Sequence, residues 1–111
     1  MKKLSLIIVM CLPFYVNAQT GNTGAREITS IGCHKEDNTC FFQISGSPVG
    51  PSSCNETSVR FNSALDKNGE NTLSLVTAAY FANKKVTLNI VDECYLYQQN
   101  FPTFNYFTIV N

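Results

Sequence analysis

The sequence predicts a mainly β fold: a small barrel of five strands, with one α-helix between the third and fourth strands and disulfide bonds across it. Three observations lead to this prediction. Several short segments alternate between apolar and polar residues, one later segment has helical spacing, and four cysteines remain beyond an apolar leader. The same order of elements also allows an open antiparallel sheet with one helix packed across it.

The first 18 residues have the three parts of a secretory signal peptide. Two lysines give a positive start, residues 4–16 are mostly apolar, and residues 16–18 (VNA) are small or compact at the cleavage position. The apolar stretch is too short to span a bilayer comfortably, and no later stretch is longer. We therefore expect an exported protein, periplasmic or secreted and without a membrane span. Its mature chain begins at Gln19, and Cys11 is removed with the leader.

The mature chain is long enough for one domain with a modest core, which we place at residues 26–111. The whole chain has eight basic and eight acidic residues, and two of the basic ones lie in the leader, so the mature net charge is about −2. No basic block or stripe remains in the sequence. This composition argues against a nucleic acid or an anionic membrane as partner.

The mature chain begins with a segment rich in glycine, asparagine and threonine, residues 19–25, which we expect to be a flexible arm. Residues 26–33 (REITSIGC) predict the first strand. Ile28 and Ile31 are an odd number of residues apart, which indicates a β-bulge near Gly32.

A polar turn over residues 34–39 (HKEDNT) precedes the second predicted strand, residues 40–45 (CFFQIS). Alternation places three apolar side chains of this strand on one face: Cys40, Phe42 and Ile44.

The next segment, GSPVGPSS, contains two prolines and two glycines and predicts a loop. The third strand follows over residues 57–63, with Val59 and Phe61 facing the core. Its polar residues are expected to face outward: Ser58, Arg60 and Asn62.

The helix is predicted after the cap and turn residues DKNGEN. Leu73, Val76 and Tyr80 recur at helical spacing beside alanines, which favour helix, and we expect these three residues to form its buried face. Asn83 can adopt the left-handed conformation that ends a helix. The two lysines that follow suit the negative end of the helix dipole.

The period then changes to that of a strand, because Val86, Leu88 and Ile90 alternate with other residues. An aromatic loop is predicted over residues 95–101 and a last strand over residues 104–110. A lone helix between the third and fourth strands is the arrangement of the OB-fold, in which the helix would cover the open end of the barrel.

The segment from Cys54 to Cys94 resembles the second half of many small exported bacterial proteins. In these, a cysteine, an aromatic strand, a helix ending in two alanines and an aromatic residue, a further strand and a second cysteine follow one another. The same layout occurs in the OB-fold B subunits of AB5 toxins of the subtilase-cytotoxin type, and the strands REITSI and CFFQIS fit it too. The resemblance covers residues 26–110, and it implies an OB-fold, a receptor-binding role and assembly into a ring.

The toxin subunits bind sialylated glycans partly through a serine just ahead of the first strand. The matching stretch here, residues 24–27 (GARE), contains no serine. The resemblance therefore transfers no sugar-binding residue to this chain.

The four mature cysteines predict disulfide bonds, because a small exported domain needs such reinforcement and its compartment is oxidising. Cys33 and Cys40 flank a short turn between two strands and can face each other across it. Cys54 and Cys94 would close a long loop around the helix, a gain on the order of 4 kcal/mol in the chain-entropy model, and the resembling proteins support this second bridge. The alternative pairing, Cys40–Cys54 with Cys33–Cys94, is closer to the toxin-subunit pattern.

The sequence offers no catalytic constellation, and we expect no enzyme activity and no cofactor. His34 is the only histidine, and it adjoins Cys33, which we expect to be oxidised. The cysteine spacings of seven, fourteen and forty residues lack the close pairs of a zinc site, so no metal is expected. The neighbouring Asp92 and Glu93 are expected to be solvated.

Aromatic residues crowd the last part of the chain, and a small barrel cannot bury all of them. Tyr95, Tyr97 and Phe101 lie in the predicted loop, where they could form a ligand-binding surface for a glycan or a host or other protein receptor. The competing interpretation makes the aromatics ordinary core and strand residues. The sequence therefore predicts a non-enzymatic binding module, with a homo-oligomeric B-type subunit as one form. The alternative is an envelope protein that binds or inhibits another protein.

Overall fold

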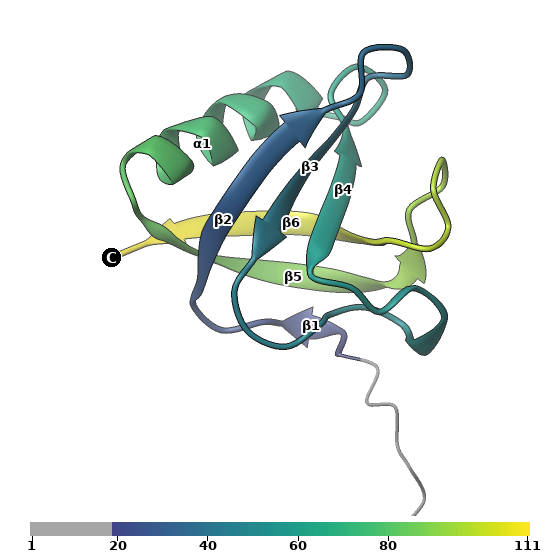
Figure 1. Cartoon of the computed structure of the whole chain (residues 1–111), viewed down its shortest axis with the longest axis horizontal. Coiled ribbons are helices and arrows are strands. Elements are labelled where there is room, and N and C mark those ends of the chain that lie inside the picture. Colours follow the sequence, from purple (N-terminus) through teal and green to yellow (C-terminus); the bar gives the residue numbers. More distant parts are fainter. Residues whose placement is uncertain (1–18) are drawn as a thin grey trace, which may run out of the picture.

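The structure, a computed structural model, describes residues 19–111, so the predicted signal peptide over residues 1–18 lies outside the described residues. The predicted order of strands and helix is confirmed, with one very short strand added at the start (Figure 1). In chain order the elements are β1 (Gly21–Asn22), β2 (Arg26–Cys33), β3 (Thr39–Ile44), the 3₁₀ turn η1 (Ser52–Cys54), β4 (Ser58–Asn62), α1 (Gly69–Phe81), β5 (Lys85–Cys94) and β6 (Pro102–Val110).

The strands form one antiparallel sheet that bends strongly at β2 and β5. β3 pairs with β2 on one side and with β4 on the other, while β5 pairs with β6, with β1 and with the first residues of β2. β4 and β6 lie next to each other, and Thr103 Oγ1 donates a hydrogen bond to the Arg60 carbonyl at 2.7 Å. No ladder joins β4 to β6 within residues 19–111. The sheet is therefore open, so the predicted closed five-stranded barrel is not confirmed, and the structure has the alternative arrangement.

A β-bulge interrupts β2, but not where the sequence predicted it. Ile28 pairs with Ile44 and Ser30 with Gln43, so Thr29 is the extra residue, whereas the bulge was expected near Gly32. The bulge lets both isoleucines of β2 pack against the core despite their odd separation.

The core lies between the bent sheet and α1, and Phe42 is at its centre. Its ring is fully buried, and ring centroids of Phe61, Phe104 and Phe107 lie 5.5 to 6.3 Å away. Such tilted and edge-to-face pairs are the geometries that aromatic rings prefer. The inward positions predicted for the strands are confirmed as buried: Cys40, Phe42, Ile44, Val59, Phe61, Val86, Leu88 and Ile90.

α1 packs across the sheet (Figure 1), mainly through Val76 and Ala79, which are 1% exposed. Leu73 is partly buried against the same core, as predicted. The prediction for Tyr80 is wrong, because its side chain is only half-buried and packs edge to face on Phe81. The small side chain of Ala79 takes the inward position and lets the helix approach the sheet closely.

The helix ends as the sequence predicted. Asn83 has the left-handed φ of 56°, and its N–H donates to the Tyr80 carbonyl at 3.2 Å. The next N–H, of Lys84, donates to the Ala79 carbonyl at 2.9 Å. These bonds satisfy carbonyl groups that the last helical turn leaves without a partner.

The segment 19–25 is hydrogen-bonded to the sheet, whereas the sequence predicted a flexible arm. Gly21 pairs with Ile90 of β5, and the Thr23 N–H donates to the Leu88 carbonyl at 3.0 Å. The Thr23 hydroxyl in turn accepts the Leu88 N–H at 3.1 Å. The arm thus covers part of one edge of β5.

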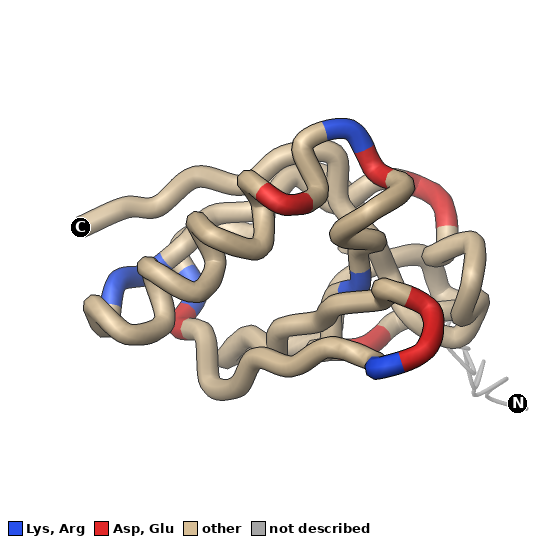
Figure 2. Tube along the Cα trace, turned by 90° about the horizontal axis from the view of Figure 1, so that it is seen from above, with Lys and Arg blue, Asp and Glu red and all other residues tan. Residues whose placement is uncertain are grey.

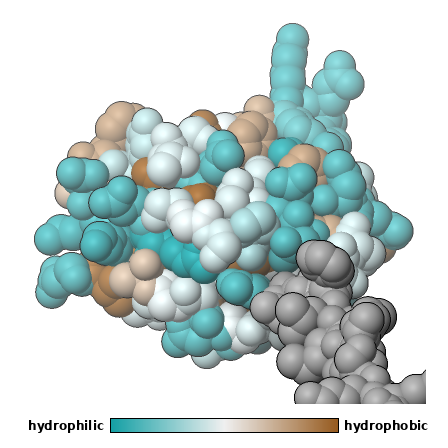
Figure 3. Space-filling view, turned by 60° about the horizontal axis from the view of Figure 1, so that its bottom comes forward, coloured by the Kyte–Doolittle hydropathy of each residue, from teal (hydrophilic) through white to brown (hydrophobic). Residues whose placement is uncertain are grey.

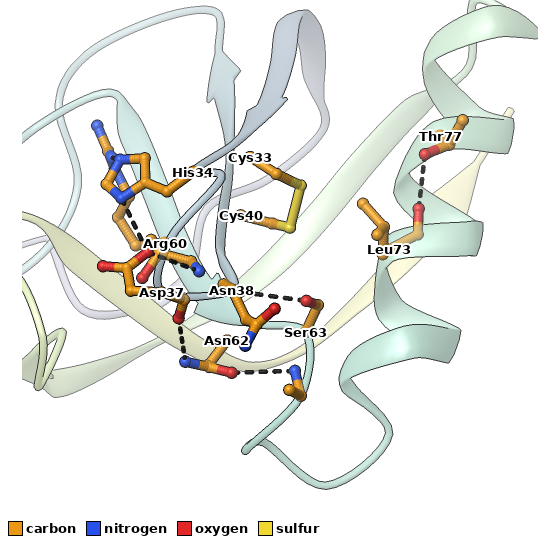
Figure 4. The surroundings of a disulfide bond; sticks show 12 residues. Cys33, His34, Asp37, Asn38, Cys40, Arg60, Asn62, Ser63, Leu73 and Thr77 are labelled. Atoms are coloured by element: carbon orange, nitrogen blue, oxygen red, sulfur yellow. Dashed lines mark hydrogen bonds and ion pairs between the residues drawn. A yellow bond between two sulfur atoms is a disulfide. The ribbon is translucent and has the colours of Figure 1, made fainter.

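Both predicted disulfides are present, which rules out the alternative pairing. Cys33 and Cys40 are direct partners across β2 and β3, with Cα atoms 4.0 Å apart (Figure 4). Cys54 and Cys94 join η1 to the end of β5, with Cα atoms 5.9 Å apart. One bridge thus closes the β2–β3 turn, and the other lies at the start of the β5–β6 turn.

Charged residues occur singly or in short runs along the chain, as Figure 2 shows on the Cα trace. No area of one sign dominates that view, in keeping with the small net charge of the mature sequence. On the side seen in Figure 3, hydrophobic residues form small separate patches among hydrophilic ones. In the described part of the chain, no helix combines the length and the apolar character needed to cross a membrane.

Candidate ligand-binding site

Two turns that are far apart in the sequence meet over the outer face of β3 and β4. They are the β2–β3 turn, residues 34–38, and the β5–β6 turn, residues 95–101. Arg60 of β4 connects them, because its Nη1 donates to Gln98 Oε1 at 2.8 Å and lies 3.3 Å from His34 Nε2. We call this surface the two-loop site and define it by six residues: His34, Phe41, Arg60, Tyr97, Gln98 and Phe101.

Arg60 lies between two aromatic rings. Its guanidinium carbon is 4.4 Å from the centroid of Phe41 and 3.7 Å from that of Phe101. A cation over a ring face is attracted by the quadrupole of the ring. Arg60 is on the outer face of β4, as predicted, but the rings cover it so fully that only 8% of it is exposed. Asn62, also expected to face solvent, is buried as well.

The buried guanidinium has no carboxylate partner among the described residues. Burial lowers the pKa of Arg60, although a guanidinium remains charged at neutral pH. Its Nε is buried and makes no hydrogen bond to any described residue. The charge is therefore held by two ring faces, by Gln98 and by His34 rather than by an ion pair.

His34 lies between Asp37 and Arg60, and Figure 4 shows its ring beside the arginine. Its Nδ1 is 3.1 Å from Asp37 Oδ1, and its side chain is one-third exposed. The Thr39 N–H donates to the same carboxylate at 3.1 Å, and this bond is the main reason that the pKa of Asp37 lies below its usual value. Asp37 is thus ionised at neutral pH and orients the imidazole.

Phe41 can cover the sheet because it lies opposite a glycine. Gly32 of β2 is its partner in the β2–β3 ladder, and a Cβ there would be only 2.6 Å from Phe41 Cζ. The absence of a side chain at Gly32 lets the ring lie down across β2. Phe41 is in turn the ladder partner of Arg60, which positions the arginine under the ring.

The three residues predicted for ligand binding all belong to the β5–β6 turn, but they differ in exposure. Tyr95 is buried, and its hydroxyl is hydrogen-bonded to Thr39 Oγ1 at 2.9 Å, so it supports the turn and presents no ring to solvent. Tyr97 is 49% exposed and packs edge to face on Tyr95. Phe101 is half-buried over Arg60. Tyr97 and Phe101 can therefore contact a ligand directly.

The sequence did not single out Phe41, Arg60 or Gln98 as site residues. An aromatic residue and an arginine at outward positions of neighbouring strands are a signal that could have found the first two. Gln98 gave no such signal, because its role depends on a hydrogen bond between residues 38 positions apart.

One surface hollow adjoins the two-loop site, and two others lie beside β6. One of about 360 Å³ is lined by the β2–β3 turn, from His34 to Asp37. Two others, of about 350 and 410 Å³, lie between α1 and β6 and share lining residues such as Thr72 and Asn105. Phe104 and Phe107 of β6 pack on the core beneath this second region, whereas Tyr106 is exposed beside it.

The groups at the two-loop site suit binding rather than nucleophilic or metal chemistry. Cys33, next to His34, is bonded to Cys40, so no thiolate nucleophile adjoins the imidazole. Within residues 19–111, no group of three or more histidine, cysteine or carboxylate side chains could hold a metal ion. The residues of the two-loop site instead offer ring faces, amide groups and a fixed cation, which suit recognition.

In comparisons with known proteins, no family model matches the chain, and no curated protein or solved structure matches it significantly.

Proposed function

We propose that this protein is an exported, non-catalytic binding module that recognises a neutral glycan at the two-loop site. The proposal depends on one observation: the β5–β6 turn presents two aromatic rings, Tyr97 and Phe101, together with the side-chain amide of Gln98. Arg60 holds this amide in place through a hydrogen bond. Sugars stack their C–H faces on aromatic rings and exchange hydrogen bonds with amides. A tyrosine adds a hydroxyl group that can bond to a sugar hydroxyl.

The strand order supports an OB-like interpretation of the fold. The ladders run β4–β3–β2–β5–β6, and β6 returns beside β4, so the strands follow one another in a ring even though no ladder closes it. OB-folds bind oligosaccharides and oligonucleotides on the face of their second and third strands, between the first and fourth connecting loops. The corresponding parts here are β3, β4 and the two turns of the site.

Charge favours a neutral glycan over a nucleic acid. The cation of the site, Arg60, is buried between rings and cannot pair with a row of phosphates. Lys35, which follows His34 in the β2–β3 turn, is exposed, but Glu36 and Asp37 come directly after it. Nucleic-acid binding depends on several accessible cations along the backbone.

The two disulfides support export, because such bonds persist in oxidising compartments and are common in small secreted domains. The predicted signal peptide points the same way. The resemblance to toxin B subunits adds ring assembly to the proposal, since weak single sites gain avidity when several are arrayed together.

A glycan array with the mature chain, residues 19–111, tests the proposal. We expect binding to neutral glycans, and Tyr97→Ala should weaken it about tenfold through the lost ring contact. Tyr106→Ala is the matched control, because Tyr106 is also exposed but lies on β6, away from the site. Loss of binding in Tyr106→Ala alone would move the site to the region between α1 and β6.

The same experiment distinguishes glycan binding from the alternative function, an envelope protein that binds or inhibits another protein. If the array shows no glycan and the protein instead forms a stoichiometric complex with an exported protein of its own cell, the envelope-protein alternative holds. Native mass measurement of the mature chain, alone and with glycan, tests the ring: a single monomeric species in both samples would contradict it.

A further inference from the structure

The contacts of His34 fit only one protonation state of its ring. Arg60 Nη1 carries hydrogens and no lone pair, so His34 Nε2, 3.3 Å away, can only accept from it. The Asp37 carboxylate is an acceptor and requires a hydrogen on Nδ1. The two neighbours together therefore select the neutral ring with its proton on Nδ1.

Protonation of His34 would break one of these contacts and keep the other. A hydrogen on Nε2 would point at the guanidinium, which has nothing to accept it and carries the same sign of charge. The Nδ1–H bond to Asp37 would remain, and it would become a charge-assisted bond. Because Asp37 lies in the same turn as His34, the turn would keep its internal bond and lose its connection to Arg60.

The groups that face the ring come from three parts of the fold. Asp37 of the same turn attracts the protonated ring, and Arg60 of β4 repels it. Phe41 of β3 presents its ring at 6.0 Å in an edge-to-face arrangement. Beyond Arg60, Gln98 is neutral and holds the same Nη1. Lys35 and Glu36, on the turn itself, line the adjoining hollow with opposite charges.

We propose that His34 is an acid-sensitive connection between the two turns of the two-loop site, and that its protonation releases the β2–β3 turn from Arg60 and weakens ligand binding. The part that concerns the ligand rests on the proposed function. Arg60 keeps its two rings and Gln98, so the β5–β6 turn stays in place. The base of the β2–β3 turn also stays in place, because Asn62 Nδ2 donates to the Asp37 carbonyl and Ser63 donates to the Asn38 carbonyl. Acid would thus free only the His34 side of this turn from Arg60.

The chain offers a clean test because His34 is its only histidine. Histidine is the side chain type whose charge ordinarily changes near neutral pH. NMR of the free mature chain between about pH 5 and 8 should show the Nδ1–H tautomer at pH 7.5. The Arg60 guanidinium signals and the amides of residues 34–38 should shift with the same midpoint as the His34 ring.

His34→Gln is the control, because a glutamine side chain offers an acceptor oxygen and does not titrate. In this variant the pH-dependent shifts of Arg60 should vanish. The inference is overturned if His34 has the Nε2–H tautomer at pH 7.5. It is also overturned if the Arg60 signals stay constant while His34 titrates in a protein whose near-UV circular dichroism is unchanged.

A second arm concerns binding. The affinity of the protein for a glycan from the array should be about tenfold weaker at pH 5 than at pH 7.5, the size expected for the loss of one hydrogen bond. His34→Gln should remove this difference. An equal pH dependence in the variant would overturn the effect on binding. The NMR arm needs no ligand, so its outcome is independent of whether the proposed glycan is found.

Discussion

The hydroxyl groups of Tyr95 and Thr39 lie 2.9 Å apart in the interior of the protein and connect the β5–β6 turn to the first residue of β3. Thr39 is fully buried, and its N–H donates to Asp37 in the neighbouring turn. One residue therefore makes hydrogen bonds beneath both turns of the two-loop site. This bond is one of the contacts that hold the β5–β6 turn against β3.

Tyr95→Phe should lower the free energy of unfolding by about 1–3 kcal/mol, because it leaves the buried Thr39 hydroxyl without its partner. Chemical denaturation of the mature chain measures this change. Tyr97→Phe removes a hydroxyl from a half-exposed ring and should have little effect. Equal effects of the two substitutions would mean that the buried hydrogen bond contributes nothing to stability.

Alkaline titration should detect the same burial. Desolvation raises the pKa of Tyr95 above its ordinary value of 10.0. The unfolded chain then loses this proton at a lower pH than the folded protein, so the stability contributed by Tyr95 is present below pH 10 and declines as pH rises further. Tyrosinate absorbance should show one of the four mature tyrosines ionising last. Tyr95→Phe should remove that late step.

Arg60→Met should leave the free energy of unfolding unchanged or raise it, because it replaces a buried cation that has an unpaired Nε with an apolar side chain of similar length. Glycan binding should nevertheless fall, since Gln98 loses the donor that holds it. Denaturation and the glycan array, applied to the same protein, measure the two effects. A strongly destabilised Arg60→Met protein would show that the contacts of the guanidinium with the two rings outweigh its desolvation.

Leu73→Ala should cost about 2 kcal/mol, near the lower end for such core truncations, because Leu73 packs on the core but is partly exposed. Val76→Asp should prevent folding, since it would bury a charge at a position that is 1% exposed. Glu70→Ala, in the exposed first turn, should change stability little. Thermal melts compare the three proteins, and a mild Val76→Asp would mean that α1 does not pack as described.

Much of the fold could be predicted because its signals are local. The period of two residues placed most strand ends within two positions, and the short turn between Cys33 and Cys40 indicated their pairing. Ala79 was missed in favour of Tyr80 because helical spacing allows both, and only the close approach of helix to sheet favours the smaller residue. The pairing of Gly21 with β5 was missed because the strand is too short to have a period.

The site was harder to predict, because its central contact joins parts of the chain that meet only after folding. Alternation correctly placed Arg60 on the outer face of β4. Its burial depends on Phe101, more than forty positions later, and on Gly32, which makes room for the Phe41 ring. Whether the sheet closes into a barrel is equally non-local. It depends on whether the edge strands β4 and β6 come within hydrogen-bonding distance along their length.

The two disulfides have a consequence for the thermodynamics of recognition. Cys33–Cys40 spans the base of one turn of the proposed binding site, and Cys94 directly precedes Tyr95 at the base of the other. A covalent bond at each base restricts the conformations that the turns can visit before a ligand arrives, so less conformational entropy is lost on binding. Formation of the disulfides would thus prepare the turns for the proposed ligand as well as stabilise the fold. A chain kept reduced would begin each encounter with turns that visit more conformations, and it would lose more entropy on binding.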